Sequence, residues 1–377
     1  MKRNLSIDIL RGLIMVIMAI DHVRLYGGIP AGGDSSALFF TRWITHFCAP
    51  GFAFLAGVSI LFMRQKMNSV NQLSVFLLSR GILLVILEIT LIRFLWAFQI
   101  NYSQFFLAGV IWMLGWCMVL MALLARLKPI VAGITGIVII VAQQSFAHIP
   151  QLLPEAMRNS FSLFWNFIYP TGIDEPENIN ILYVIVPWIG VMAAGYAFGM
   201  VVQLEERKRR KACLLIGGAF ILLFIVMGTL SVPANNGENQ MPFVLQLLNQ
   251  RKYPASVLFL LMTLGPLILL IPAFENSKGK VIHVLSVFGK TAMFYYLLHI
   301  LIIHLSALLV NLIRTGSIHQ DWYGAAPYYT TQDEGLRWSL PLLYLVWLVD
   351  VVILYFACRW YLRYKTRHPG KRWLRFV

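Results

Sequence analysis

The stretch that decides the fold is residues 212–230, ACLLIGGAFILLFIVMGTL, which carries no charged side chain. A helix needs about 20 mostly apolar residues to cross the hydrocarbon core of a bilayer, so this run has the length and composition of a membrane-spanning helix. It directly follows a basic run at residues 207–211, which is typical of a spanning helix that starts at a cytoplasmic surface.

Apolar runs of this kind recur along the whole chain. The 377 residues are 59% hydrophobic and only 12% charged, which excludes a water-soluble globular protein. Long runs in place of short alternating strands exclude an outer-membrane barrel. We therefore predict an all-α fold, a polytopic transmembrane helical bundle of about ten spans that forms one domain over residues 1–377. The expected spans are residues 6–26, 40–63, 73–96, 104–125, 129–148, 180–202, 212–230, 254–273, 286–310 and 339–362.

The net charge of +15 is an orientation signal, although in a soluble domain it would suggest nucleic acid. Ten spans put both termini on one side of the membrane, and the basic residues gather there. That side holds Lys2, Arg3, Arg64, Lys66, Arg126, Lys128, residues 207–211, Lys278, Lys280 and the basic tail, whereas the other side holds Arg158, Arg251, Lys252, Arg314 and Arg337. We expect cytoplasmic termini, anionic lipids of the bilayer as partners, and no nucleic acid.

The first expected span contains ionisable side chains, each of which needs a partner or a purpose in the bilayer. At about 100° per residue, Asp8, Arg11 and His22 fall on one stripe of the helix. Asp21 lies beside His22, and the stripe extends for about 21 Å. Such a stripe should face the bundle interior or a wet cavity. In the alternative, Asp8 and Arg11 form an i,i+3 pair at the interface and His22 extends to the opposite surface.

The second expected span brings another histidine to the same end of the bundle. Arg42 and His46 are four residues apart and share a helix face. Pro50 has no N–H, so the carbonyl of His46 loses its helical partner and the helix is expected to bend there. A neutral imidazole can take a proton from an attacking amine or hydroxyl, or carry an acyl group. The alternative is a kinked helix end whose histidine bonds to backbone.

We expect no metal ion in this chain. His22, His46 and Asp21 could hold zinc, but their spacing matches no zinc motif. The cysteines lie in or beside apolar runs and are expected to be packing residues; they are Cys48, Cys117, Cys213 and Cys358.

Later spans also carry polar groups. His299 and Asp350 fall at similar depth, and a buried His–Asp pair between the last two helices is favoured over a proton relay. Glu88 is expected to meet a cation from another helix. Lys290 could hold a phosphate of an incoming cofactor, although an extended surface lysine explains it equally well. Gly190 and Gly195 are spaced for close helix packing.

Several motifs resemble the heparan-alpha-glucosaminide N-acetyltransferase catalytic-domain family, most closely its bacterial branch. These motifs are SIDILRG at 6–12, DH at 21–22, FFTRWITH at 39–46, APGFAFLAGVS at 49–59, VPWIGVMAAGY at 186–196 and FYYLLH at 294–299. The resemblance runs along most of the chain. It implies a multi-pass acyltransferase of the bacterial inner membrane that takes acetyl groups from cytoplasmic acetyl-CoA and places them on a sugar amine or other glycan acceptor across the membrane.

Residue roles follow from joining this resemblance to the polar stripe. His22, His46 and Asp21 are the expected catalytic residues, and either His22 or His46 is the base that deprotonates the acceptor. Asp8, Arg11 and Lys290 are expected to bind the cofactor. Arg24 or Arg42 would steady an oxyanion or an anionic acceptor, and His299 is assigned to the substrate. The partners are the bilayer, a small-molecule or glycan acceptor and, as an open alternative, a second copy in a homodimer. Aromatic side chains of the outer loops could stack on a sugar ring, although an interfacial aromatic belt is the commoner explanation; they are Trp165, Trp322, Tyr323, Tyr328 and Tyr329.

A proton-coupled transporter or flippase is the alternative function. The same carboxylates and histidines would then form a proton relay. That reading predicts inverted repeats and paired broken helices, and neither is clear in the sequence.

Overall fold

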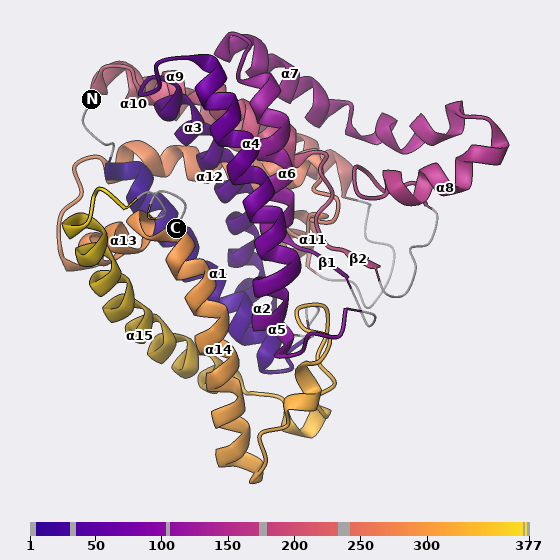
Figure 1. Ribbon diagram of the computed structural model, residues 1–377, viewed down its shortest axis with the longest axis vertical. Helices are drawn as coiled ribbons and strands as arrows, with labels where there is room; N and C mark the ends of the chain where they lie inside the picture. The colour runs from indigo at the N-terminus through magenta and orange to yellow at the C-terminus, as the bar shows by residue number, and fades with distance from the viewer. Residues whose placement is uncertain are drawn as a thin grey trace. The chain divides into compact units, whose positions relative to one another are not determined.

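The computed structural model describes residues 5–30, 35–102, 106–172, 179–232, 242–371 and 374. Nearly all of its regular structure is helical, which confirms the all-α class (Figure 1). Helix contacts divide the chain into two units, Met1–Cys48 with Thr90–Phe105 and Ala273–Val377, and Ala49–Ile89 with Phe106–Pro272. The single domain over residues 1–377 stays a prediction.

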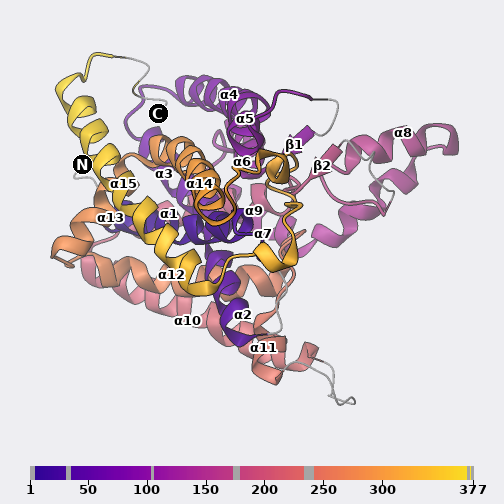
Figure 2. The same ribbon diagram turned by 90° about the horizontal axis from the view of Figure 1, so that it is seen from below.

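The first unit is a cluster of long helices with a few short turns. Its elements are α1 (Leu5–Tyr26), α2 (Ser36–Trp43), η1 (Ile44–Phe47), α5 (Arg93–Ala97), α13 (Lys280–Lys290), α14 (Ala292–Thr315), η4 (Gln320–Tyr323), η5 (Glu334–Leu336) and α15 (Leu340–Arg367). Helix α1 packs against α13, α14 and α15, and α15 runs alongside α14 (Figures 1 and 2). Helix α1 therefore lies at the centre of this unit.

The second unit contains the middle of the chain. Its elements are α3 (Cys48–Arg64), α4 (Val70–Leu87), β1 (Phe106–Ala108), α6 (Val110–Leu124), α7 (Pro129–Val141), η3 (Gln143–Leu152), α8 (Glu155–Trp165), β2 (Ile179–Ile181), α9 (Trp188–Val202), α10 (Glu206–Ser231), α11 (Phe243–Leu248) and α12 (Val257–Phe274). The main helix pairs are α4 with α6 and α7 with α9. The π-helical segment η2 (Glu88–Ile92) joins α4 to α5.

Six helical segments of the described residues are long and apolar enough to cross a membrane. They are Ser36–Arg64, Val70–Ala97, Glu206–Ser231, Val257–Phe274, Ala292–Thr315 and Leu340–Arg367, and the bent pair α7–η3 would be a seventh. Helices α6 and α9 are apolar but only 15 residues long. The chain is therefore a multi-pass membrane protein, whereas the count of ten spans and the side of the termini stay predictions.

Two expected spans begin later than the apolar pattern indicates. Residues at their starts form a parallel strand pair, with Phe106 opposite Ile179 and Ala108 opposite Ile181. Each strand has three residues, and α6 begins only at Val110. Hydropathy alone misses this change because the strand residues are as apolar as the helix that follows.

Where the sequence predicts a bend near Pro50, the structure has a local tightening of the helix. The chain is α-helical to Trp43, 3₁₀-helical over Ile44–Phe47, and α-helical again from Cys48. Proline at position 50 cannot donate to the carbonyl four residues earlier, so the preceding turn closes with i→i+3 bonds instead. His46 lies in this 3₁₀ turn.

Backbone contact between α1 and α13 sets the position of the polar side chains of α1. A Cβ atom added at Gly289 would lie 1.8 Å from the carbonyl oxygen of Asp8, and one added at Gly12 would lie 1.9 Å from that of Leu285. Any side chain at either position would force the helices apart. In the second unit, a Cβ at Gly195 would lie 2.1 Å from the carbonyl oxygen of Phe54, which confirms the close packing expected there.

Candidate functional site

A histidine pair lies at the centre of the first unit. His22, on the last two turns of α1, is partly exposed, whereas His299, on α14, is fully buried. Nδ1 of His22 and Nε2 of His299 are 2.7 Å apart, at hydrogen-bond distance. The two rings are stacked with a 24° angle between their planes. An accessible imidazole with a buried imidazole behind it has the arrangement of a general base and the group that orients it.

Aromatic rings and backbone surround this pair. Trp96 of α5 meets the His22 ring edge-on, with the centroids 4.7 Å apart. On the far side of His299, Nδ1 lies 2.5 Å from the carbonyl oxygen of Tyr296 and 3.2 Å from that of Tyr295. Tyr295 also stacks on the His299 ring. The orientation of both imidazoles is therefore fixed by three separate elements, α1, α5 and α14.

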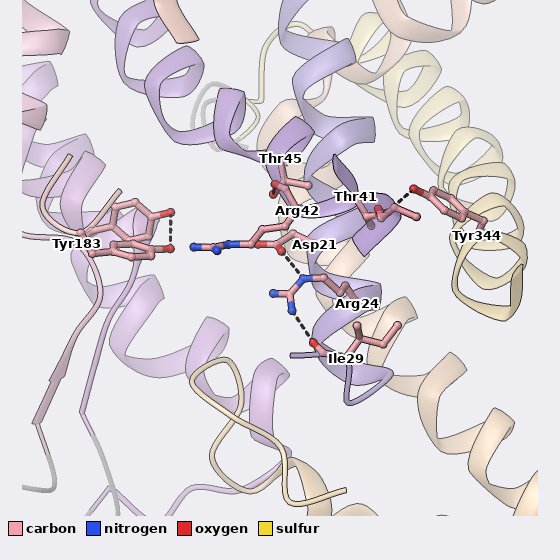
Figure 3. Close-up of polar contacts among 10 residues, drawn as sticks. Asp21, Arg24, Ile29, Thr41, Arg42, Thr45, Tyr183 and Tyr344 are labelled. Atoms are coloured by element: carbon pink, nitrogen blue, oxygen red, sulfur yellow. Dashed lines mark hydrogen bonds and ion pairs between the residues drawn. The ribbon is translucent and has the colours of Figure 1, made fainter. Parts of the chain in front are cut away.

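Asp21 and Arg24 form an ion pair one residue away from His22. Nε of Arg24 donates to Oδ1 of Asp21 at 2.9 Å, and its Nη1 donates to the carbonyl oxygen of Ile29 at 2.5 Å (Figure 3). Arg24 is only 8% exposed. These contacts tie the end of α1 to the turn that follows it, so both side chains fix the backbone on which His22 stands.

His46 and Arg42 belong to the segment that packs on α1. His46 is buried in η1, and Arg42 of α2 is partly exposed, with its carbonyl oxygen accepting from the Thr45 hydroxyl at 2.7 Å. Helix α1 and η1 are in contact. The structure brings His22 to His299; a shared site of His22 and His46 stays a prediction.

The three residues expected to bind the cofactor lie near the other end of α1. Nη1 of Arg11 donates to Oδ1 of Asp8 at 3.4 Å and to the carbonyl oxygen of Gly289 at 3.2 Å. Lys290 follows directly and ends α13. The i,i+3 pair that the sequence allowed is therefore present, and it places Arg11 beside the end of α13 that carries Lys290.

Two expectations about partners are wrong. Both ring nitrogens of His299 bond elsewhere, while Oδ1 of Asp350 accepts from the Ser306 hydroxyl at 2.7 Å. No cation of another helix pairs with Glu88 in the part of the chain that the structure describes. Its carboxylate accepts backbone N–H groups at the start of α6, from Gly109, Ile111 and Trp112. Carboxylates suit this position because the helix N-terminus has unpaired donors and a positive dipole end.

Tyr323 is likewise not free to stack on a sugar, because it is fully buried. Its hydroxyl accepts from Nδ2 of Asn311 at 2.9 Å and donates to the carbonyl oxygen of Tyr26 at 3.1 Å. Burial raises the pKa of Tyr323 to about 12, although the Asn311 bond acts in the opposite direction. Nearby, His304 bonds through Nδ1 to the Leu95 carbonyl and through Nε2 to Gln320. These bonds join α14 to α5 and to η4.

Sequence reasoning missed Trp96 and the pairing of His22 with His299. The two histidines are 277 residues apart, and no local spacing links them. The FYYLLH motif at 294–299 pointed to His299, but not to its partner. Among the described residues, no group of three or more His, Cys, Asp or Glu side chains is arranged to hold a metal ion.

The family model described as heparan-alpha-glucosaminide N-acetyltransferase, catalytic, matches residues 3–234. The chain belongs to this family. The heparan-alpha-glucosaminide N-acetyltransferase family is one of transmembrane acetyltransferases, so membership makes transferase chemistry the activity class of the chain. The matched residues include His22 and His46, whereas His299 and Lys290 lie beyond them. The comparison with individual curated proteins gives no match.

Proposed function

We propose that this protein transfers an acetyl group from cytoplasmic acetyl-CoA to the amine of an amino sugar, or to another glycan acceptor, at the outer face of a bacterial cytoplasmic membrane. The observation that carries the proposal is the His22–His299 pair, because a partly exposed imidazole held from behind is suited to general-base catalysis. Family membership supplies the reaction class.

In the proposed reaction the acceptor nitrogen attacks the thioester carbonyl of acetyl-CoA. A C–N bond forms, the C–S bond breaks, and Nε2 of His22 takes the proton that the amine loses. The proton then passes to the CoA thiolate, which leaves as the free thiol. A positioned base of this kind contributes about 10²–10⁴-fold to a rate. Arg42 is the cation assigned to the oxyanion, because Arg24 is bound to Asp21 and Ile29. His46 is assigned to the acceptor side.

The donor would be held at the other end of α1. Arg11 and Lys290 are partly exposed cations on two helices in backbone contact, and paired cations suit the phosphates of a CoA nucleotide. Asp8 orients the Arg11 guanidinium. Eleven residues separate Arg11 from His22, which is about 16 Å along the helix axis. The pantetheine arm would extend along this length, with the adenine nucleotide at the cytoplasmic end.

The test follows thiol release from acetyl-CoA by the purified protein in detergent, with glucosamine as acceptor and mass spectrometry of the product. The substitution His22→Ala should lower kcat by about 10²-fold or more. His283→Ala is the matched control. His283 is exposed on α13, so loss of its imidazole should leave kcat unchanged. Full activity in His22→Ala would refute the assignment of the base, and no turnover with any acyl-CoA offered would refute the function.

A further inference from the structure

The hydrogen bonds of His299 determine where its proton lies. Its Nδ1 faces the carbonyl oxygens of Tyr295 and Tyr296, and a carbonyl oxygen can only accept. Nδ1 of His299 is therefore the protonated nitrogen. The ring is fully buried, and a second proton would put a charge where solvation is lost. His299 is consequently neutral, and its Nε2 is an acceptor.

This arrangement determines the tautomer of the second ring. Nε2 of His299 lies 2.7 Å from Nδ1 of His22, and an acceptor needs a donor opposite it. Nδ1 of His22 must then carry the hydrogen. In a neutral imidazole only one nitrogen is protonated, so when His22 is neutral its lone pair is on Nε2.

We propose that His299 is a positioning residue that holds His22 in the Nδ1–H tautomer and so makes Nε2 the basic atom. The chain of bonds runs from the carbonyl oxygens of α14 through His299 to His22, and Trp96 bounds the His22 ring from a second side. The same logic orients the histidine of other acyl-transfer enzymes, where a third group fixes the tautomer of the base. Here a neutral imidazole, anchored on backbone, has that role.

The tautomer is inferred from the bonds of His299, whereas its consequence for the rate rests on the proposed function. When Nε2 accepts the proton of the amine, the bond from Nδ1 to His299 is kept. The proton then leaves from Nε2 to the thiolate. His299 gains and loses no proton in the cycle, and this separates a positioning residue from a proton relay.

Magic-angle-spinning NMR of the full chain with ¹⁵N-labelled histidine, in lipid bilayers, reads the tautomer directly. The signals of His22 are identified by their loss in His22→Ala. We expect a protonated Nδ1 and an unprotonated Nε2 in the wild-type ring. A His22 signal with the proton on Nε2 would overturn the inference, whatever the activity of the protein.

Two substitutions of His299 separate positioning from packing. His299→Leu removes the acceptor and should lower kcat about 10²-fold, with the KM for acetyl-CoA changed less than about threefold because the base, not donor binding, is affected. His299→Gln restores an acceptor oxygen, so its kcat should be at least about tenfold higher than that of His299→Leu. Equal kcat in the wild type and in both variants would overturn the inference.

His304→Gln is the matched control for damage to the helix. His304 is on α14, five residues from His299, and is also fully buried with both ring nitrogens bonded. Its substitution should lower thermal stability and leave the His22 tautomer unchanged. A chain that shows the expected tautomer but turns over no acyl-CoA would support the tautomer and refute the proposed function, so the two failures can be told apart.

Discussion

The backbone contact between α1 and α13 predicts a large effect of a single methyl group. In Gly289→Ala the new Cβ would lie 1.8 Å from the carbonyl oxygen of Asp8, and ordinary contact begins at 3.4 Å. The helices must therefore separate locally by about 1.6 Å, and since the obstacle is backbone it cannot rotate away. We expect the free energy of unfolding to fall by about 3 kcal/mol, which should lower the apparent Tm by about 5 °C.

The substitution should also disturb the donor end of the proposed site. Nη1 of Arg11 donates to the carbonyl oxygen of Gly289, so separation of the helices moves this side chain away from Lys290. The KM for acetyl-CoA should rise while His22 is left intact. Thermal unfolding in detergent and steady-state kinetics measure the two effects.

Gly218→Ala is the matched control. Gly218 is also in a long helix, α10, but an added Cβ would have nothing within 4 Å. Alanine is favoured over glycine in a helix by about 0.5–1 kcal/mol, so this variant should be as stable as the wild type or slightly more so. A Gly289→Ala protein with the Tm and the KM of Gly218→Ala would refute the close packing of α1 on α13.

Three further predictions concern the scaffold. Glu88→Ala should lower the free energy of unfolding by about 1–3 kcal/mol, because three N–H groups at the start of α6 lose their acceptor. Glu88→Gln should lower the free energy of unfolding by less, and thermal unfolding compares the two variants. His304→Gln should lower the Tm in the same assay, because the bonds to Leu95 and Gln320 are weakened, yet keep kcat within about twofold of the wild type. Because burial raises the pKa of Tyr323 to about 12 from 10.0, the folded state holds this proton more tightly than the unfolded state. The stability that this proton contributes is complete below about pH 10 and is lost as the pH rises toward 12. Denaturant titrations at a series of pH values should therefore show a smaller alkaline decline in the free energy of unfolding for Tyr323→Phe than for the wild type.

The sequence predicted those features that depend on local spacing. The apolar runs predicted the helical membrane class, and the separation of three residues allowed the pair of Asp8 and Arg11 as the alternative to an unpaired stripe. Proline at position 50 predicted the irregular turn at His46. Each of these follows from one helix and its periodicity.

The contacts between helices could not be predicted in the same way. Hydropathy gives the depth of a residue in the bilayer but not the direction in which it points around the bundle. His299 and Asp350 were therefore paired by depth, although His299 turns to α1 and Asp350 to Ser306. For Glu88 the sequence predicts a cationic partner because a carboxylate in a bilayer needs a partner, whereas the structure has backbone amides at the start of α6 as its donors.

In the proposed reaction His22 is the base of a transfer from one side of the membrane to the other. Its most direct test is a sealed proteoliposome with the chain in a known orientation, acetyl-CoA on the cytoplasmic side only and glucosamine on the opposite side only. We expect N-acetylglucosamine on the acceptor side with the wild type and with His283→Ala, and a rate lower by about 10²-fold or more with His22→Ala. Equal product from the wild type and His22→Ala would contradict it, as would product formed only when donor and acceptor share one compartment.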